Sequence, residues 1–468
     1  MAMNPKELAH AEIAEIAPLI QNKEISPVDL VDLSLSRIAE LDSTINAFIH
    51  VFEDEARAVA KAHEQEIMSG AYRGPLHGIP IGIKDIYETG PTTCGSKTLD
   101  GYVAEEDCFS VKKLKQAGAI VIGKTGTYEF AYGPPTLETH FPPTRNAWNT
   151  DFECGGSSSG TAGAIAAGLT YAGMGSCTGG SIRWPAQCCG HVGLKHTYGR
   201  VSRRGVYPLS QSLDHAGPLA RTVQDSAHML QGCAGFDPLD PGSADVAVPD
   251  FSAKIGRDIQ GMRFGVMRDL YEDSAAPAVK KAFETALGQL EKMGAHIVDV
   301  PSISLEELLA FCFPLMWADA AAIHAQNIKT RADDYGRHTK LYLLWGLCVS
   351  NAAYQNGLRV RAQVRDQQLA ALTTTADVLI VPTVGFQTPH VLEHTPGLEF
   401  LSGAAFPFYT PIFNHTGLPA IQVPCGFDDD HMPVGLQIAG KPFDEQTIIQ
   451  AAYAYEQEAG WVKQRPDL

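Results

Sequence analysis

Short apolar segments that fit buried β-strands alternate with helical segments along most of this chain. Apolar runs of four to eight residues, bounded by Gly, Pro or charged residues, are typical of buried strands. The segments that fit strands are 78–85, 119–122, 377–381, 420–424 and 434–438. The segments that fit helices are 5–65, 110–117, 160–168 and 444–459. This alternation predicts an α/β fold with helices on both faces of a sheet, a three-layer α/β/α sandwich.

The length of 468 residues bears on the domain organisation. Single hydrophobic cores stop growing near ~250–300 residues, so we expect one large domain with insertions or two lobes in close contact. Residues 5–65 are predicted to form N-terminal helices, one of which starts at Ser26-Pro27, a hydroxyl cap followed by proline. Residues about 300–370 fit a helical insertion that caps one end of the sheet, and residues 236–260 fit a surface connection.

Charge and cysteine content narrow the function classes. The formal net charge is -17, which disfavours nucleic-acid binding because that needs a basic face. The first residues lack a basic stretch followed by an apolar one, and no run approaches ~20 apolar residues, so neither a secretion signal nor a spanning helix is predicted. The ten cysteines form no disulfide pattern of a small secreted domain, and we expect reduced thiols in a cytoplasmic protein.

Two formal motifs are explained better by packing than by ligand binding. Residues 118–125 match G-x-x-x-x-G-K-[ST], but a P-loop needs its middle residues in a loop whose N–H groups face phosphate. Here those residues are Ala, Ile, Val and Ile, which predict a strand. Residues 188–191 (CCGH) lack the ligand spacing of a zinc site, and buried packing of the cysteines explains them. We therefore expect no metal and no cofactor.

Two Gly- and Ser-rich segments, 155–160 (GGSSSG) and 175–183 (GSCTGGSIR), are the most informative part of the sequence. Flexible linkers contain the same residue types. These segments, however, are tightly flanked by helix- and strand-forming residues, which a linker is not. Glycines let the backbone approach a substrate carbonyl, and consecutive N–H groups form an oxyanion hole, so serines on such turns indicate a hydrolase.

Residues 155–203 resemble the Gly/Ser-rich signature of the amidase signature family, the Ser-cisSer-Lys amidohydrolases. Further blocks resemble the family in the same order along the chain: 78–85, 123–133, 144–149, 414–420 and 433–437. Such an ordered set is far more specific than a lone GGSS. The resemblance implies a single amidase domain over 1–468, with a signature core at 75–235 and a large mixed β-sheet.

The resemblance also implies roles for individual residues. Ser181 matches the nucleophile, Ser157 the bridging serine whose peptide bond is cis in the family, and Lys84 the general base. Elementary chemistry is consistent with these roles. A serine nucleophile needs a base, no Ser/His/Asp arrangement is evident, and a lysine acts as a base when it is neutral. Lowering its pKa from ~10.4 to ~7 by burial corresponds to about 4–5 kcal/mol. The oxyanion donors are predicted to be backbone N–H groups of the nucleophile turn: Thr178, Gly179 and Gly180.

The sequence departs from the family pattern at three places. Cys177 stands where the family usually has Asp, which affects the hydrogen bonding of the nucleophile loop and leaves the triad intact. Trp184 is bulky for its position and narrows the site. Residues 134–143 (PPTLETHFPP) differ from the block typical of the family's tRNA-dependent amidotransferase subunits.

The implied reaction is hydrolysis of a C–N bond in a linear, non-peptide, small-molecule amide through a serine acyl-enzyme. Tyr132, Gly133 and Trp184 are predicted to bind substrate, and they favour aryl or alkyl amides. Three further aromatic residues fit core packing better: Phe311, Phe313 and Trp317. Carbamate (urethane), urea and biuret-type hydrolysis use the same triad, and the A-type subunit of a tRNA-dependent amidotransferase, which acts on charged tRNA, is another alternative. We expect a small-molecule substrate, no nucleic-acid or membrane partner, and a homodimer, since the family's members are often dimers.

Overall fold

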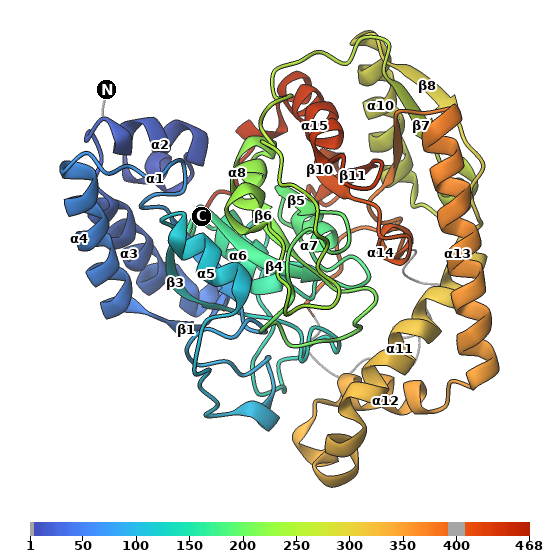
Figure 1. Ribbon diagram of the computed structural model, residues 1–468, viewed down its shortest axis with the longest axis horizontal. Coiled ribbons are helices and arrows are strands. Elements are labelled where there is room, and N and C mark those ends of the chain that lie inside the picture. Colours follow the sequence, from blue (N-terminus) through green and yellow to red (C-terminus); the bar gives the residue numbers. More distant parts are fainter. Residues whose placement is uncertain (1–3, 392–407) are drawn as a thin grey trace.

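The computed structural model describes residues 4–391 and 408–468. At its centre is an 11-stranded sheet with parallel and antiparallel neighbours (Figure 1). In order across the sheet, the strands are β1 (Phe48–Val51), β3 (Ile120–Thr125), β2 (Pro80–Lys84), β4 (Ala172–Cys177), β6 (His215–Ala220), β5 (Val192–Lys195), β10 (Ala420–Phe427), β11 (Pro433–Ala439), β9 (Val378–Pro382), β7 (Arg263–Val266) and β8 (His296–Asp299). The large mixed sheet implied by the sequence is confirmed.

Helices cover both faces of this sheet. In β3, Val121 packs toward one face, and its neighbours Ile120 and Ile122 pack toward the other. The first face carries α2 (Ile13–Gln21), α5 (Phe109–Gln116), α8 (Val223–Cys233), α10 (Pro277–Lys292) and α15 (Glu445–Ala459). The second face carries α3 (Pro27–Ile45), α4 (Glu53–Met68), α6 (Ser159–Ala166) and α7 (Arg183–Cys188). The predicted three-layer sandwich is therefore confirmed.

Three further helices lie together at one side of the molecule (Figure 1, yellow to orange). They are α11 (Leu305–Thr330), α12 (Arg337–Leu347) and α13 (Asn351–Thr374), and α11 packs against both of the others. Of these, α13 runs from the β7 and β8 end of the sheet toward α11 and α12 (Figure 1). The hydroxyl of Ser304 caps α11 by accepting a hydrogen bond from the N–H of Glu307 at 3.2 Å. Three short helices complete the set: α1 (Pro5–Ala9), α9 (Arg268–Tyr271) and α14 (Pro411–His415).

Among the residues that the structure describes, α11 alone is long and apolar enough to cross a membrane by length and composition. The mean hydropathy of its most apolar window is 1.5, and 39% of that window is buried. Asp319 interrupts the apolar run of this helix, so the sequence holds no run of ~20 apolar residues there, and the expectation of no spanning helix stays a prediction. Core helices share these features, so the finding is weak evidence for a membrane span.

Two local expectations have different outcomes. Residues 48–51 lie within the segment predicted to be helical, but they form β1, which pairs with β3 at the edge of the sheet. The four residues are too few to give a strand signal without that partner. Residues 118–125 contain a strand, as expected, and Lys124 points into the protein and forms an ion pair with Asp85 at 3.1 Å.

Candidate active site

Lys84 is the last residue of β2, and its side chain is fully buried. Its Nζ donates hydrogen bonds to the hydroxyls of Ser157 at 2.7 Å and Ser176 at 2.9 Å. Burial lowers the pKa of Lys84 to about 7, against smaller opposing effects of Cys177 and Asp214. A large fraction of the amine is therefore neutral near neutral pH, which is the form that accepts a proton.

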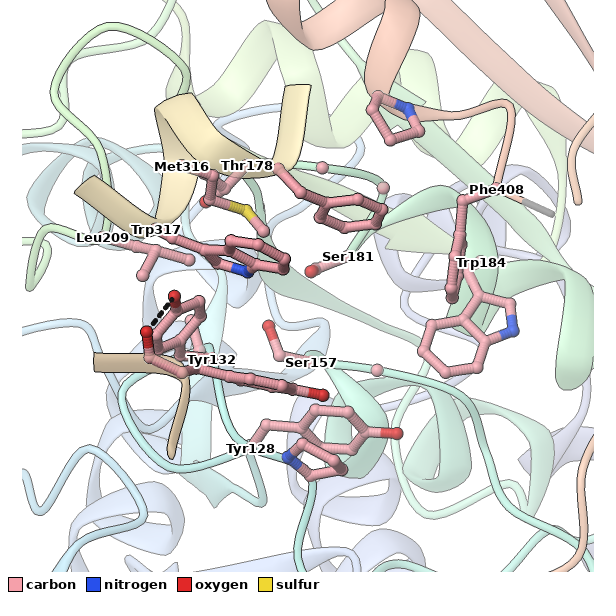
Figure 2. A pocket seen from close by; sticks show the side chains of 18 of the residues that line it. Tyr128, Tyr132, Ser157, Thr178, Ser181, Trp184, Leu209, Met316, Trp317 and Phe408 are labelled. Atoms are coloured by element: carbon pink, nitrogen blue, oxygen red, sulfur yellow. Dashed lines mark hydrogen bonds between the residues drawn. The ribbon is translucent and has the colours of Figure 1, made fainter. Parts of the chain in front are cut away.

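The two serines predicted for the triad line one cavity, and Ser157 is the one hydrogen-bonded to this amine. The Gly156–Ser157 peptide bond is cis, and the carbonyl of Ser157 accepts a hydrogen bond from the N–H of Tyr128 at 3.1 Å. The Tyr128 ring lies over Gly156 so closely that a Cβ there would sit 2.2 Å from the ring. Figure 2 shows Ser157 and Ser181 lining one cavity from opposite sides of a narrow gap.

The turn that carries Ser181 connects β4 to α7. Its residues Thr178, Gly179 and Gly180 line the same cavity as the two serines. Gly180 has φ +139, and a Cβ there would lie 2.1 Å from the hydroxyl oxygen of Thr410. That hydroxyl donates to the carbonyl of Gly179 at 2.7 Å, so the carbonyl is engaged and the turn is held against the start of α14.

Asp214 supports this turn from behind, and it was not predicted from the sequence. One carboxylate oxygen accepts a hydrogen bond of 2.6 Å from the Thr178 hydroxyl. The other accepts the N–H groups of Leu209 at 2.8 Å and Ser210 at 3.0 Å. Burial raises the pKa of Asp214 to about 6 despite these hydrogen bonds. A lone Asp between two loops carries no spacing signal that would distinguish it from other acidic residues.

Ser176, the second partner of Lys84, was also missed, although it lies within the Gly/Ser-rich segment 175–183.

The cavity has a volume of about 290 Å³ and is mostly apolar. Tyr132 and Trp184, both predicted to bind substrate, line it, and the Tyr132 hydroxyl donates to the carbonyl of Tyr342 at 3.4 Å. The remaining bulky apolar or aromatic lining residues are Tyr128, Leu209, Leu309, Phe313, Met316, Trp317, Tyr342 and Phe408 (Figure 2). None of the described residues that line this cavity carries a charged side chain.

Three of the predictions about pocket residues need correction or refinement. Gly133 does not line this cavity; it packs on α12, where a Cβ would lie 2.0 Å from the hydroxyl oxygen of Thr339. Phe313 and Trp317 were assigned to the core, but they line the cavity. Phe311 is buried in the core, as expected. Helical periodicity shows which side of α11 faces inward, and it does not distinguish a packed interior from a cavity wall.

One group of described residues has metal-ligand chemistry, namely His63 and Glu66 on α4 with His77 before β2. The Nδ1 of His77 accepts a hydrogen bond from the N–H of Arg73 at 3.1 Å, so its Nε2 carries the proton and faces Glu66 at 3.2 Å. The Arg73 guanidinium also donates to both oxygens of Glu66 at 2.6 Å. These contacts already engage Glu66 and both ring nitrogens of His77.

Comparison with known proteins gives one consistent family. Residues 29–449 match the family model described as Amidase. The chain is 37% identical to the A-type subunit of glutamyl-tRNA(Gln) amidotransferase from Carboxydothermus hydrogenoformans over 495 residues, covering 99% of this chain and 100% of that one. It is 37% identical to a Pseudomonas putida protein described as an amidase over 467 residues, covering 98% of each chain. Most of the compared sequence relatives share the first of these descriptions.

Comparison with solved structures indicates the same family. A bacterial aryl acylamidase of the amidase signature family matches with a TM-score of 0.87 and 25% identity, over 96% of both chains. The fold and the matching sequences define an enzyme that hydrolyses amide C–N bonds. The chain belongs to the amidase signature family, as its sequence motifs indicated.

Proposed function

We propose that this enzyme hydrolyses the C–N bond of a small, largely apolar amide through an acyl-enzyme on Ser181. The observation that carries the proposal is the 2.7 Å hydrogen bond from the buried Lys84 amine to Ser157, beside an apolar cavity that Ser181 also lines. The proposal concerns the residue roles and the substrate class.

The reaction begins when the Ser181 hydroxyl attacks the substrate carbonyl. Its proton moves to Ser157 while Ser157 passes its own proton to Lys84, whose neutral amine is the general base. Backbone N–H groups of the turn from Thr178 to Ser181 stabilise the oxyanion, because they lie at the cavity wall and need no reorganisation during the reaction.

Collapse of the tetrahedral intermediate returns the proton from Lys84 through Ser157 to the leaving nitrogen. The C–N bond breaks, and the amine departs. Water then attacks the Ser181 ester by the same relay and releases the acid, which restores the starting enzyme. The proton transfers in both halves of the reaction thus follow one path between the same three side chains.

The lining of the cavity supports an apolar acyl group. Glutamine, the substrate expected for an amidotransferase, is a zwitterion that needs a cation for its carboxylate and an anion for its ammonium. The described lining residues offer neither, whereas Tyr132, Trp184 and Trp317 offer large aromatic faces. An aryl or alkyl amide therefore fits best, and carbamates, ureas and biuret-type compounds remain candidates with the same chemistry.

The second candidate is the A-type subunit of a tRNA-dependent amidotransferase, a description that most of the compared relatives carry. This function requires partner chains and charged tRNA, whereas a small-molecule amidase is active alone. The experiment is to assay the purified chain on an aryl anilide, an alkyl amide, a carbamate, a ureide and glutamine. Cleavage of the anilide or alkyl amide supports the proposal. Cleavage of glutamine alone, or activity only after partner chains are added, contradicts it.

A further inference from the structure

Arg183, the first residue of α7, is fully buried, and the oxygen atoms that it contacts in the described part of the chain are neutral. Its guanidinium donates to the side-chain oxygens of Gln437 and Asn414 and to the carbonyl of Thr410 at 2.9 Å. Within residues 4–391 and 408–468, no carboxylate lies within ion-pair distance of it. The group beside it that can carry a negative charge is the thiol of Cys177, whose Sγ lies 3.6 Å from Nη2.

The other titratable groups near Cys177 are bases, apart from Asp214, whose carboxylate accepts a hydrogen bond from the hydroxyl of the next residue, Thr178. Lys195 on β5 donates to the carbonyl of His196 at 3.1 Å and to Nε2 of His215 at 3.2 Å. The Nδ1 of His215 faces the carbonyl of Leu213 at 2.6 Å, so this nitrogen bears the proton. Burial lowers the pKa of Lys195 and that of His215 well below their ordinary values, which favours the neutral form of both. Lys84 also interacts electrostatically with the thiol.

A buried guanidinium without a counter-ion is costly, because it has lost its hydration and gained only neutral partners. Cys177 is the last residue of β4, and Arg183 follows the turn that carries Ser181, so the two side chains meet across the base of that turn. We propose that Cys177 is ionised in the folded protein and that its thiolate, paired with Arg183, holds the two ends of the nucleophile turn together.

The inference deepens the proposed function, because it makes Cys177 and Arg183 positioning residues for Ser181 and for the oxyanion donors. Burial alone would raise the pKa of Cys177, but the charge and hydrogen bond of Arg183 and the N–H of Ile182 outweigh it and bring the pKa below the ordinary value. By contrast, burial raises the pKa of Cys189, whose thiol contacts the carbonyl of Cys154. Cys189 therefore serves as a matched control.

The first test is a pH titration of thiolate ultraviolet absorbance in the wild-type protein and in the Cys177→Ser and Cys189→Ser variants, all of them carrying Cys348→Ser to remove the exposed thiol. We expect a thiolate step with a midpoint below about 8.5, the ordinary thiol value, in the wild type and in Cys189→Ser, and none in Cys177→Ser. If Cys177→Ser does not fold, Cys177→Asp replaces it, because it also lacks the thiol. A step that survives removal of Cys177, or a midpoint at or above the ordinary value, overturns the proposal.

The second test is kinetic rescue. Cys177→Asp supplies a carboxylate to Arg183, and we expect its kcat to stay close to that of the wild type. Cys177→Ser and Cys177→Ala leave Arg183 unpaired and should lower kcat about ten- to a hundredfold with little change in KM, as for a small misplacement of catalytic groups. Equal activity of Cys177→Ser and the wild type, or no advantage of Asp over Ser, overturns the proposal.

If the wild type cleaves no amide, the proposed function fails, and the absorbance titration alone decides the ionisation of Cys177.

Discussion

The hydroxyl of Thr178 donates a 2.6 Å hydrogen bond to Asp214 directly behind the turn that carries Ser181. Because the same carboxylate also binds the N–H groups of Leu209 and Ser210, it joins two loops that meet at the cavity. Asp214 therefore helps to fix the position of Thr178, and so of an N–H group proposed to bind the oxyanion.

Removing the Thr178 hydroxyl should therefore slow catalysis without greatly changing substrate binding. We expect Thr178→Val to lower kcat about tenfold or more and Thr178→Ser, which keeps the hydroxyl, to stay near the wild type. Asp214→Asn should lower kcat as well. In a double-mutant cycle, the effects of Thr178→Val and Asp214→Asn should be coupled by about 0.5–3 kcal/mol, and strict additivity contradicts a direct link.

The role of Lys84 predicts a specific pH dependence. The base must be neutral, and burial lowers the pKa of Lys84 to about 7, so kcat/KM should rise with pH up to about 7 and then level off. Asp214, whose pKa burial raises to about 6, adds a second loss of activity at lower pH. The measurement is kcat/KM against pH on a substrate without titratable groups. Activity that is highest in acid contradicts a lysine base.

A matched variant separates the charge of Lys84 from its chemistry. Lys84→Arg keeps a cation that does not lose its proton, so we expect almost no turnover at any pH. Lys84→Ala should be equally inactive while it keeps the wild-type circular dichroism spectrum. Substantial activity of either variant means that another group is the base.

Trp317 should govern which acyl groups are accepted, because it lines the cavity from α11. Trp317→Ala should lower kcat/KM for a bulky aryl amide about ten- to a hundredfold, from the loss of ~1.5–3 kcal/mol of apolar contact. The same change should affect a small alkyl amide much less. Leu347→Ala on α12 is the control, since Leu347 is exposed and lies outside the cavity. Equal losses on both substrates argue against a role in selectivity.

The buried ion pair of Lys124 and Asp85 should matter for stability. The Lys124 amine also donates to the carbonyl of Tyr87 at 2.6 Å and to the hydroxyl of Thr92 at 2.7 Å. Lys124→Met leaves a buried carboxylate without its cation, so we expect a loss of about 3–5 kcal/mol in the free energy of unfolding. Lys112→Met removes an exposed ion pair with Glu106 and should cost less than about 1 kcal/mol. Denaturant unfolding of both variants checks the contrast.

The sequence predicted the central strands because their signal is local. β2, β9, β10 and β11 are apolar runs bounded by Gly, Pro or charge, and the structure has them where expected. β1 was missed because its four residues become a strand only by pairing with β3, and that partner is distant in the sequence. The residues of the proposed triad could be named from the sequence because they lie in dense motifs. Lys84 and Ser157 are separated by 73 positions in the sequence, yet they are hydrogen-bonded.

Contacts made by the tertiary fold alone were not predictable. Asp214 acts through a hydrogen bond to another loop, and Gly133 is required for packing against Thr339 on α12. Phe313 and Trp317 have the spacing of core residues, and only the position of α11 beside the serines makes them part of the cavity wall. These roles could be assigned only from the spatial arrangement, because the local sequence is the same whether a residue packs in the core or lines the cavity.

In the proposed triad, Lys84 ends β2 and the two serines lie on loops beside the sheet, whereas much of the opposite cavity wall comes from α11. Part of the ligand choice is thus encoded by a stretch of the gene separate from the one that encodes the reaction chemistry. A directed-evolution library restricted to the inward-facing codons of α11 should yield enzymes with new preferences while the turnover machinery stays intact, which makes this scaffold a practical parent for designed biocatalysts.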